Sequence, residues 1–364
     1  MGLFANLKKR KQEKAALEAI EQGSSLARLG RYEDAIEYYR EAVRLSPDDV
    51  FAYHRLGETY SNLCRAGEAI ESYRKAVSLA PDDEYGLYVL GDLLVSQQKY
   101  EEAANLLGRV IRLKPDHVKA RYKLGVIYES LERYEEAATE YRHILFKQPG
   151  FAEAHFGLGV ICQRQGDYNE ALRCFERAVE LNPESPEAFY KLGAVQSRLD
   201  QHQEAIESYH RAIRLKPDYA EAHYNRGVAY HKLGRYSEAI ESYKQAVLVK
   251  PHYTEAHFNL GTVCSKLGRH DEAALAFSQA TKSKPDFAEA YYYLGLAYRQ
   301  LGYYVEAAEA HKQAIRVRVD YAQAHYKLGQ VFLLMADKKA ALDQYKILKT
   351  IDSVMAEKFF AEIY

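Results

Sequence analysis

Apolar and small residues recur on two helical faces within every 34 residues of the chain. In the stretch 220–253, Gly227 and Tyr230 lie on one face of a first predicted helix, with the spacing typical of an amphipathic helix. Ala239 and Tyr243 have the same relation in a second predicted helix. Neither helix can bury its apolar face alone, so the pattern predicts a helix–turn–helix unit that packs against neighbouring units.

Turn residues separate the two predicted helices. Gly234 ends the first, because glycine readily adopts the positive φ found at helix ends. Pro251 ends the second, because proline lacks an N–H and clashes with the preceding turn. The stretch therefore predicts two short helices with defined ends.

The pattern recurs ten times without insertion or deletion, so each repeat residue can be given a position from 1 (Ala220 in the seventh repeat) to 34. A glycine recurs at position 8, as Gly23, Gly57, Gly91, Gly125, Gly159, Gly193, Gly227, Gly261, Gly295 and Gly329. An alanine recurs at position 20, as Ala35, Ala69, Ala103, Ala137, Ala171, Ala205, Ala239, Ala273, Ala307 and Ala341. A proline recurs at position 32, as Pro47, Pro81, Pro115, Pro149, Pro183, Pro217, Pro251 and Pro285.

This pattern resembles the tetratricopeptide repeat, a helix–turn–helix of 34 residues, over about residues 16–355. The resemblance implies an all-α fold, a right-handed α-solenoid superhelix in which each repeat contacts only its neighbours. We expect an N-terminal lead-in at residues 1–15, ten tandem repeats forming a single solenoid at 16–352, and a C-terminal capping helix at 353–364. The family is a scaffold used with many partners, so it implies less about function.

The ends of the predicted helices carry their own signals. Asp218 is expected to cap the helix that follows, and Glu221 to answer it as in a capping box. Ser353 is the expected N-cap of the last helix, in which Phe359 and Ile363 lie on one apolar face. This helix is expected to cover the last repeat; its alternative role is to dock a partner.

Composition limits the partners and the compartment. The net charge of −1 argues against a nucleic-acid-binding protein, which normally carries a basic excess. The four cysteines form no C-x-x-C pair and are expected to pack inside helices in a reducing, cytoplasmic setting. Residues 1–14 are basic and lack the apolar core of a secretory signal. They are expected to be a solvated lead-in, with weak peripheral membrane association as the alternative, and no apolar run is long enough to span a membrane.

Catalysis, cofactors and metals are not expected. The chain contains no H-E-x-x-H, P-loop or G-x-S-x-G motif. Four of its histidines share repeat position 4 and are expected to be packing residues: His155, His223, His257 and His325.

In tetratricopeptide repeat proteins, the first helices line a concave groove that binds extended peptides or partner helices, and the resemblance implies such a groove here. Position 5 is aromatic in most repeats, position 2 is acidic in five consecutive repeats, and position 13 is basic in four. Ordinary alternatives are seam packing for the rings and favourable helix-end placement for the charges. Position 6 is asparagine in two repeats and could hold a peptide backbone. The candidate groove residues are Tyr190, Arg198, Tyr224, Asn225, Lys232, Phe258, Asn259, Lys266 and Tyr292, and the side chains of Tyr224 and Asn259 are expected to point into the groove and not into the seams.

The sequence therefore predicts a non-catalytic scaffold or adaptor that binds a protein or an extended peptide in its groove. The alternative is a self-assembling protein or a non-catalytic subunit of a larger complex.

Overall fold

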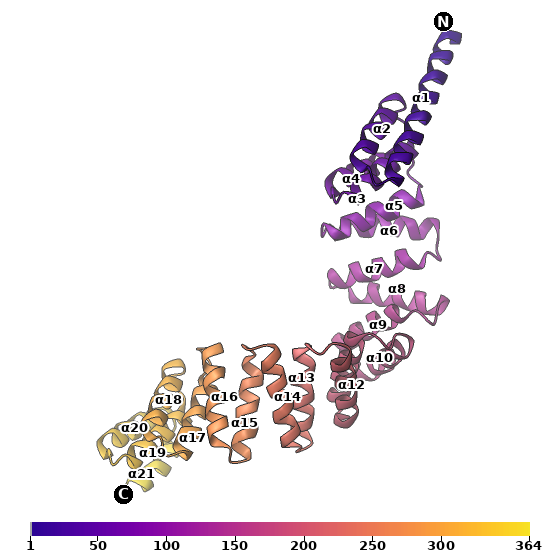
Figure 1. The fold of residues 1–364 in the computed structure, drawn as a ribbon. Coiled ribbons are helices and arrows are strands. Elements are labelled where there is room, and N and C mark those ends of the chain that lie inside the picture. The colour runs from indigo at the N-terminus through magenta and orange to yellow at the C-terminus, as the bar shows by residue number, and fades with distance from the viewer. Residues whose placement is uncertain (1) are drawn as a thin grey trace. The chain divides into compact units, whose positions relative to one another are not determined.

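The computed structural model describes residues 2–364, with side chains from residue 8 onward, and all of its regular elements are helices (Figure 1). The first helices of the repeats are α1 (Gly2–Arg28), α3 (Val50–Asn62), α5 (Glu84–Ser96), α7 (Val118–Ser130), α9 (Ala152–Gln165), α11 (Pro186–Arg198), α13 (Ala220–Lys232), α15 (Thr254–Lys266), α17 (Ala288–Gln300) and α19 (Ala322–Leu334). The second helices are α2 (Tyr32–Leu45), α4 (Ala66–Leu79), α6 (Tyr100–Leu113), α8 (Tyr134–Lys147), α10 (Tyr168–Leu181), α12 (His202–Leu215), α14 (Tyr236–Val249), α16 (His270–Ser283), α18 (Tyr304–Val317) and α20 (Lys338–Ile351). A last helix, α21, spans Ser353–Ile363.

The helices pack in chain order, as expected of a solenoid. They form two compact units, Met1–Leu181 and Asn182–Tyr364. Within each unit, every helix packs against the helices before and after it in the chain. The predicted all-α tandem of helix pairs is confirmed. Helix α1 includes most of the expected lead-in. Peripheral membrane association of residues 1–14 stays a prediction, and the side chains of residues 1–7 in that segment lie outside the described part of the chain.

Small residues let the two helices of a repeat approach closely. All the alanines at position 20 are fully buried, as predicted. A Cβ atom added to Gly227 at position 8 would lie only 2.7 Å from Cε1 of Tyr243, the buried ring at position 24. Real Cβ contacts are not that short, so the glycine column makes room for the aromatic column opposite it.

The turn between the two helices of each repeat needs a positive φ at position 15. Glycine occupies this position in five repeats, with φ 74° at Gly234. In the other five, a residue with a side chain has the same conformation: Cys64, Gln98, Glu132, Asp200 and Ala336. The turn geometry is therefore constant, even where glycine, the least strained residue for it, is missing. Cys64 is also an exposed turn residue, whereas the prediction placed all four cysteines inside helices; Cys162, Cys174 and Cys264 are buried in helices as expected.

The first helices differ in whether a side chain caps their N-terminal end. Asp49 and Asp83, both at position 34, accept hydrogen bonds from the backbone N–H groups of Ala52 and Gly86, each at 3.0 Å. At the start of α13 the N-cap is Tyr219, with no side-chain cap. The predicted capping box of Asp218 and Glu221 is therefore wrong, because Asp218 lies one residue before the position that can cap.

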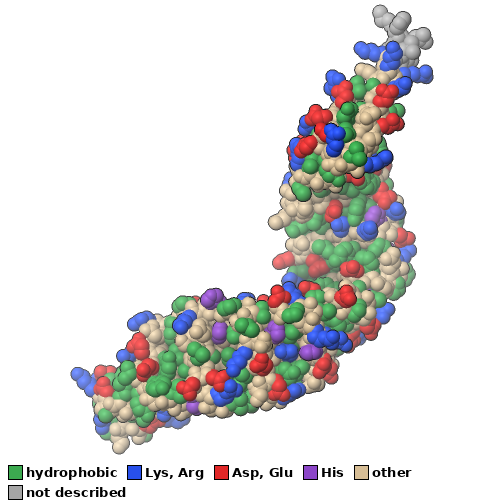
Figure 2. All heavy atoms as spheres, in the orientation of Figure 1, with side chains coloured by type: hydrophobic (Ala, Val, Ile, Leu, Met, Phe, Trp, Pro, Cys, Tyr) green, Lys and Arg blue, Asp and Glu red, His purple; other side chains and the backbone are tan. Residues whose placement is uncertain are grey.

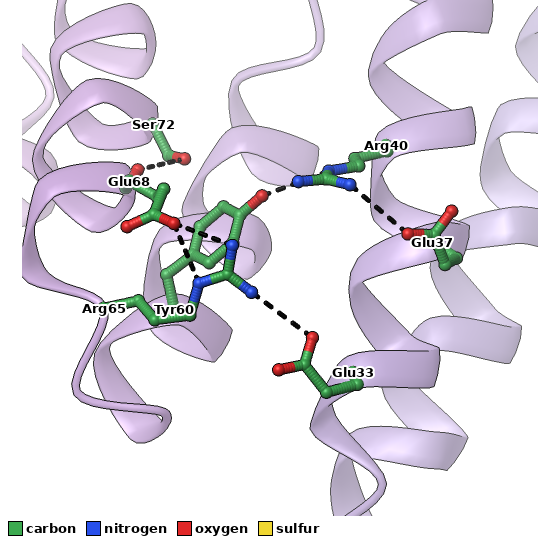
Figure 3. Close-up of polar contacts among 7 residues, drawn as sticks. All are labelled: Glu33, Glu37, Arg40, Tyr60, Arg65, Glu68 and Ser72. Carbon is green, nitrogen blue, oxygen red and sulfur yellow. Dashed lines mark hydrogen bonds and ion pairs between the residues drawn. The ribbon is translucent and has the colours of Figure 1, made fainter.

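Charged side chains connect successive repeats in the N-terminal unit (Figure 3). The Arg65 guanidinium reaches Glu68 in α4 at 2.7 Å and Glu33 in α2 at 3.3 Å, and it lies over the ring of Tyr60. Arg40 in α2 donates to the Tyr60 hydroxyl at 3.1 Å. These partly exposed contacts fix the turn of one repeat against the second helix of the repeat before it.

Helix α21 closes the last repeat. Phe359 is fully buried, and a Cβ on Gly329 would clash with its ring. Phe359 thus takes the place that a position-24 ring fills in other repeats. The N-cap is Asp352, whose side chain accepts from the Met355 N–H at 2.9 Å, so the prediction of Ser353 as N-cap is wrong by one residue.

No helix in the described part of the chain is both long and apolar enough to cross a membrane. On the face drawn in Figure 2, acidic and basic side chains are interspersed.

Candidate peptide-binding face

The first helices form the inner face of each unit. In the C-terminal unit, α11 contacts α13, and α17 contacts both α15 and α19. In the N-terminal unit, α7 contacts α5 and α9. Among the described residues, no two second helices contact each other to the same extent. The first helices therefore lie closer together than the second helices, and the predicted groove residues lie on these first helices.

The aromatic residues at position 5 are packed from two sides. The Tyr224 ring centroid lies 5.8 Å from that of Tyr243 in the same repeat and 5.0 Å from that of Tyr253 at position 34. The same arrangement recurs around Tyr190, Phe258 and Tyr292. All four rings are only partly exposed. Each ring therefore has the packing contacts of the seam-packing alternative, and a role of these rings in a groove stays a prediction.

The two candidate asparagines bind these tyrosines. The Asn225 side-chain amide donates to the Tyr190 hydroxyl at 3.0 Å, and the Asn259 amide donates to the Tyr224 hydroxyl, also at 3.0 Å. Burial raises the pKa of both tyrosines, which keeps their hydroxyls protonated. The asparagines thus link one repeat to the next, and one N–H group of each amide is engaged without a peptide.

The glutamates at position 2 belong to the same junctions. Glu221 lies 3.6 Å from the Lys250 ammonium, which in turn lies 4.6 Å from the centroid of the Tyr253 ring. Two repeats later, Glu289 pairs with Arg318, whose guanidinium lies over Tyr321. In these two repeats the expected acidic edge is therefore neutralised by a cation at position 31.

The basic residues at position 13 remain available to a partner. Arg198, Lys232 and Lys266 are exposed and lie at the C-terminal ends of α11, α13 and α15. None of them forms an ion pair with a carboxylate in the described part of the chain. The Lys266 ammonium lies 3.0 Å from Nε2 of His231. Burial, and then the charges of Lys266 and Lys232, lower the pKa of His231, so its neutral ring can accept from that ammonium.

The histidines at position 4 have the packing role that was predicted. His223, His257 and His325 are buried, and Nε2 of each lies within 3.0 Å of a backbone carbonyl oxygen at the preceding junction. His155 makes the corresponding contact while partly exposed. No group of histidine, cysteine and carboxylate side chains suited to hold a metal ion occurs among the residues with described positions.

Sequence reasoning missed the residues that complete the junctions. The aromatic side chains at position 34, such as Tyr219 and Tyr253, stack on position 5, and the cations at position 31 lie above them. Their regular 34-residue spacing was a usable signal, since Tyr219, Tyr253, Phe287 and Tyr321 are all aromatic.

The repeat architecture defines a class of helical solenoid, and comparisons with known families agree. Residues 150–357 match the family model described as the Cilia and flagella-associated protein 70 C-terminal domain, which is a tetratricopeptide repeat model. Models described as tetratricopeptide or TPR repeats match residues 23–63, 52–83, 88–150 and 130–168. Since the first match spans more than half of the chain, the chain belongs to this family of tetratricopeptide repeat proteins.

One solved structure shows the same kind of fold, and others are similar to about half of this chain. A tetratricopeptide repeat protein from Parabacteroides merdae is 19% identical, with a TM-score of 0.50, over 69% of this chain and 99% of that chain. MamA is 30% identical, with a TM-score of 0.43, over 46% of this chain and 97% of that chain. YrrB, described as a TPR protein with an unusual peptide-binding site, is 26% identical, with a TM-score of 0.47, over 52% and 97%. No curated protein sequence matched the chain significantly.

Proposed function

We propose that this chain is a non-catalytic scaffold that binds an acidic segment of a partner protein on the first-helix face of its C-terminal unit. The single observation that carries the proposal is the row of exposed cations Arg198, Lys232 and Lys266. They occupy the same repeat position on successive first helices, and no carboxylate of the described chain neutralises them.

The surroundings of the row favour an extended peptide. Successive cations are one repeat apart, so a peptide that follows the row meets one positive charge for each repeat. The residues beside the row at position 9 are small or apolar: Ala194, Val228 and Thr262. Such a surface can admit a peptide backbone close to the helices, while acidic side chains reach the cations.

The rigid ring junctions support the proposal indirectly. Because Tyr190, Tyr224 and Phe258 are each held between two other rings, the first helices are fixed relative to one another before a partner arrives. A preorganised surface loses less conformational entropy on binding.

The test is capture of partner proteins from native cell extract by the full immobilised chain. We expect the triple variant Arg198→Glu, Lys232→Glu and Lys266→Glu to lower capture of the main partner at least about tenfold, or ~1.4 kcal/mol. Raising the salt concentration should weaken wild-type capture far more than capture by the variant.

A matched control places the same charge change on the second helices. Arg211, Arg214 and Lys282 are exposed on α12 and α16, and replacing each with glutamate should leave capture within about twofold of wild type. If the control variant loses capture and the first-helix variant does not, the second-helix face binds the partner and the proposal is wrong. Sedimentation of both variants reports whether self-association, the alternative function, has changed instead.

A further inference from the structure

The second helices of the C-terminal unit carry a pocket that the proposed groove does not use. It has a volume of about 320 Å³ and lies among α14, α15 and α16. Its walls include Val247, His257, Leu260, Leu275, Ala276 and Gln279. Five of these six wall residues are apolar or aromatic, and the chain leaves the space between them unfilled.

In two other repeats, the side chains at positions 4 and 23 contact each other across the corresponding seam. In the tenth repeat, Nδ1 of His325 at position 4 lies 2.8 Å from Oε1 of Gln344 at position 23. In the fourth repeat, Arg121 at position 4 donates to Glu140 at position 23. In these two repeats, position 23 therefore places a polar side chain against the polar group at position 4.

The eighth repeat lacks that partner. Nε2 of His257 lies 2.9 Å from the carbonyl oxygen of Pro251, so this nitrogen carries the proton and donates. In the neutral ring, Nδ1 is then a hydrogen-bond acceptor. Position 23 is Ala276, which is too short to reach it. The pocket is the space that a longer side chain at Ala276 would occupy.

The neighbouring seventh repeat differs in what lies at this seam. Position 23 is also small there, as Ser242, and the buried Nδ1 of His223 likewise has no hydrogen-bond partner, but Arg226 at position 7 donates to the Ser242 hydroxyl at 3.2 Å. Positions 7 of the second to sixth and eighth to tenth repeats are all leucine. Arg226 thus brings a long polar side chain to a seam where the eighth repeat has only Leu260.

The charges at the pocket suit a neutral occupant. The two charged lining residues, Lys244 and Glu272, bind each other at 3.0 Å. Arg269 also pairs with Glu272. A charged ligand group would have to compete with these contacts, whereas a neutral ring can lie on the apolar walls. Leu275, which is 64% exposed, extends the apolar surface to the rim.

We propose that this pocket binds an aromatic side chain with a hydrogen-bond donor, a tryptophan or tyrosine of a partner protein, whose N–H or O–H donates to Nδ1 of His257. The ring packs on Leu260, Val247 and Leu275, and its donor lies against Nδ1 of His257, at the place where the Gln344 side chain lies against Nδ1 of His325 in the tenth repeat. Aromatic anchors of this kind in well-packed pockets often supply much of the binding energy at protein interfaces. The site is independent of the cation row on the first helices.

Titrations with two matched probes test whether the occupant donates a hydrogen bond in the pocket. The fluorine NMR signal of 5-fluoroindole is followed on addition of the full chain, and N-methyl-5-fluoroindole has the same ring without the N–H. We expect 5-fluoroindole to bind saturably and about three- to tenfold more tightly, because one neutral hydrogen bond separates the two probes. Equal affinities, or no saturable binding of 5-fluoroindole, would overturn the proposal.

Two variants test the location. Ala276→Gln copies the pairing of the tenth repeat, so it should fold normally and weaken 5-fluoroindole binding at least about tenfold. His257→Phe should keep the ring packing and make the two probes bind alike, with circular dichroism as the check on folding. Unchanged binding by Ala276→Gln would place the probe elsewhere and refute the site. The triple variant of Arg198, Lys232 and Lys266 should bind 5-fluoroindole like wild type, which separates this site from the proposed function.

Discussion

The junction between the second and third repeats and the junction between the seventh and eighth perform the same task with different chemistry. At the first, Asp83 caps helix α5, and its carboxylate lies 2.6 Å from Nε2 of His54 at position 5. At the second, Tyr253 caps nothing and instead stacks on Tyr224, the residue at position 5. Contact between positions 5 and 34 is thus kept, while a polar pair is exchanged for a pair of rings.

The difference shows what a repeat junction requires. A capping side chain satisfies one N–H group at the helix start and acts locally. A ring at the same position buries apolar surface against the preceding first helix and leaves that N–H to solvent or backbone. Either contact keeps position 34 against position 5, and in repeats six to nine that contact is aromatic.

The largest expected effect is the loss of a ring from an aromatic junction. Tyr253→Ala should lower the free energy of unfolding by about 2 kcal/mol, less than the 3–5 kcal/mol typical of a fully buried aromatic residue, because Tyr253 is half-buried. Urea unfolding of the full chain measures this. Tyr253→Phe, which copies Phe287 one repeat later, should stay within about 0.5 kcal/mol of wild type. If Tyr253→Ala had the same urea unfolding midpoint as the wild-type protein, the ring contact would contribute nothing to stability.

The next effect depends on pH and concerns the buried rings at position 24. Tyr39 and Tyr141 of the N-terminal unit hydrogen-bond through their hydroxyls, but both ring nitrogens of the buried His311 lack a partner. Burial, followed by the charges of Lys327 and Arg299, lowers the pKa of His311 from 6.5 to about 3. Between these two values the unfolded chain binds more protons than the folded chain, so stability falls as the pH falls.

His311→Phe should remove this acid sensitivity. At pH 5 the wild-type protein should have lost about 2 kcal/mol relative to pH 7 through this residue, whereas the variant should not show that loss. Phenylalanine already occupies position 24 at Phe175 and Phe277, so the variant should pack without strain. Unfolding curves at the two pH values provide the check, and equal acid sensitivity of both proteins would show that His311 is not the cause.

A smaller effect is expected from the capping aspartates. Asp83→Ala should cost about 1 kcal/mol, because Asp83 accepts from the N–H of Gly86, whereas Asp218→Ala should change stability by less than about 0.5 kcal/mol. Both residues follow a proline closely in the sequence, so they are matched in context. If both variants unfold alike in urea, the two kinds of junction do not differ in their capping.

The smallest effect concerns the turns that both units share. Ala336→Gly should stabilise the protein by roughly 0.5–1 kcal/mol, because Ala336 has a φ of 60°, where glycine is less strained. Asp200→Gly should act in the same direction. The unfolding midpoint of each variant is the measurement, and a lower midpoint would mean that the side chain contributes more than the strain it causes.

Much of the fold could be predicted from the sequence, because the constraints act within one repeat. Ala239 and Gly227 mark a close helix contact, and Gly234 and Pro251 mark helix ends, all by residue type and spacing. Helix starts were harder, since capping depends on whether the aspartate stands at position 33 or position 34, a difference of one residue.

The candidate site was predicted only in part. Its residues do lie on the first helices, and Arg198, Lys232 and Lys266 are exposed as expected of binding residues. The rings and the asparagines also have structural contacts that were not predicted, because Tyr224 meets Tyr253 and Asn259, which belong to the junction and to the next repeat. Such contacts depend on how repeats stack, which residue type and periodicity alone do not specify.

The contact between positions 5 and 34 is the central claim, and a double-mutant cycle on Tyr224 and Tyr253 tests it most directly. Urea unfolding of wild type, Tyr224→Ala, Tyr253→Ala and the double variant gives the coupling energy between the two rings. We predict a favourable coupling of about 0.5–1.5 kcal/mol, as for other aromatic pairs. A coupling indistinguishable from zero would contradict the account, because the rings would then be neighbours that do not hold the junction together.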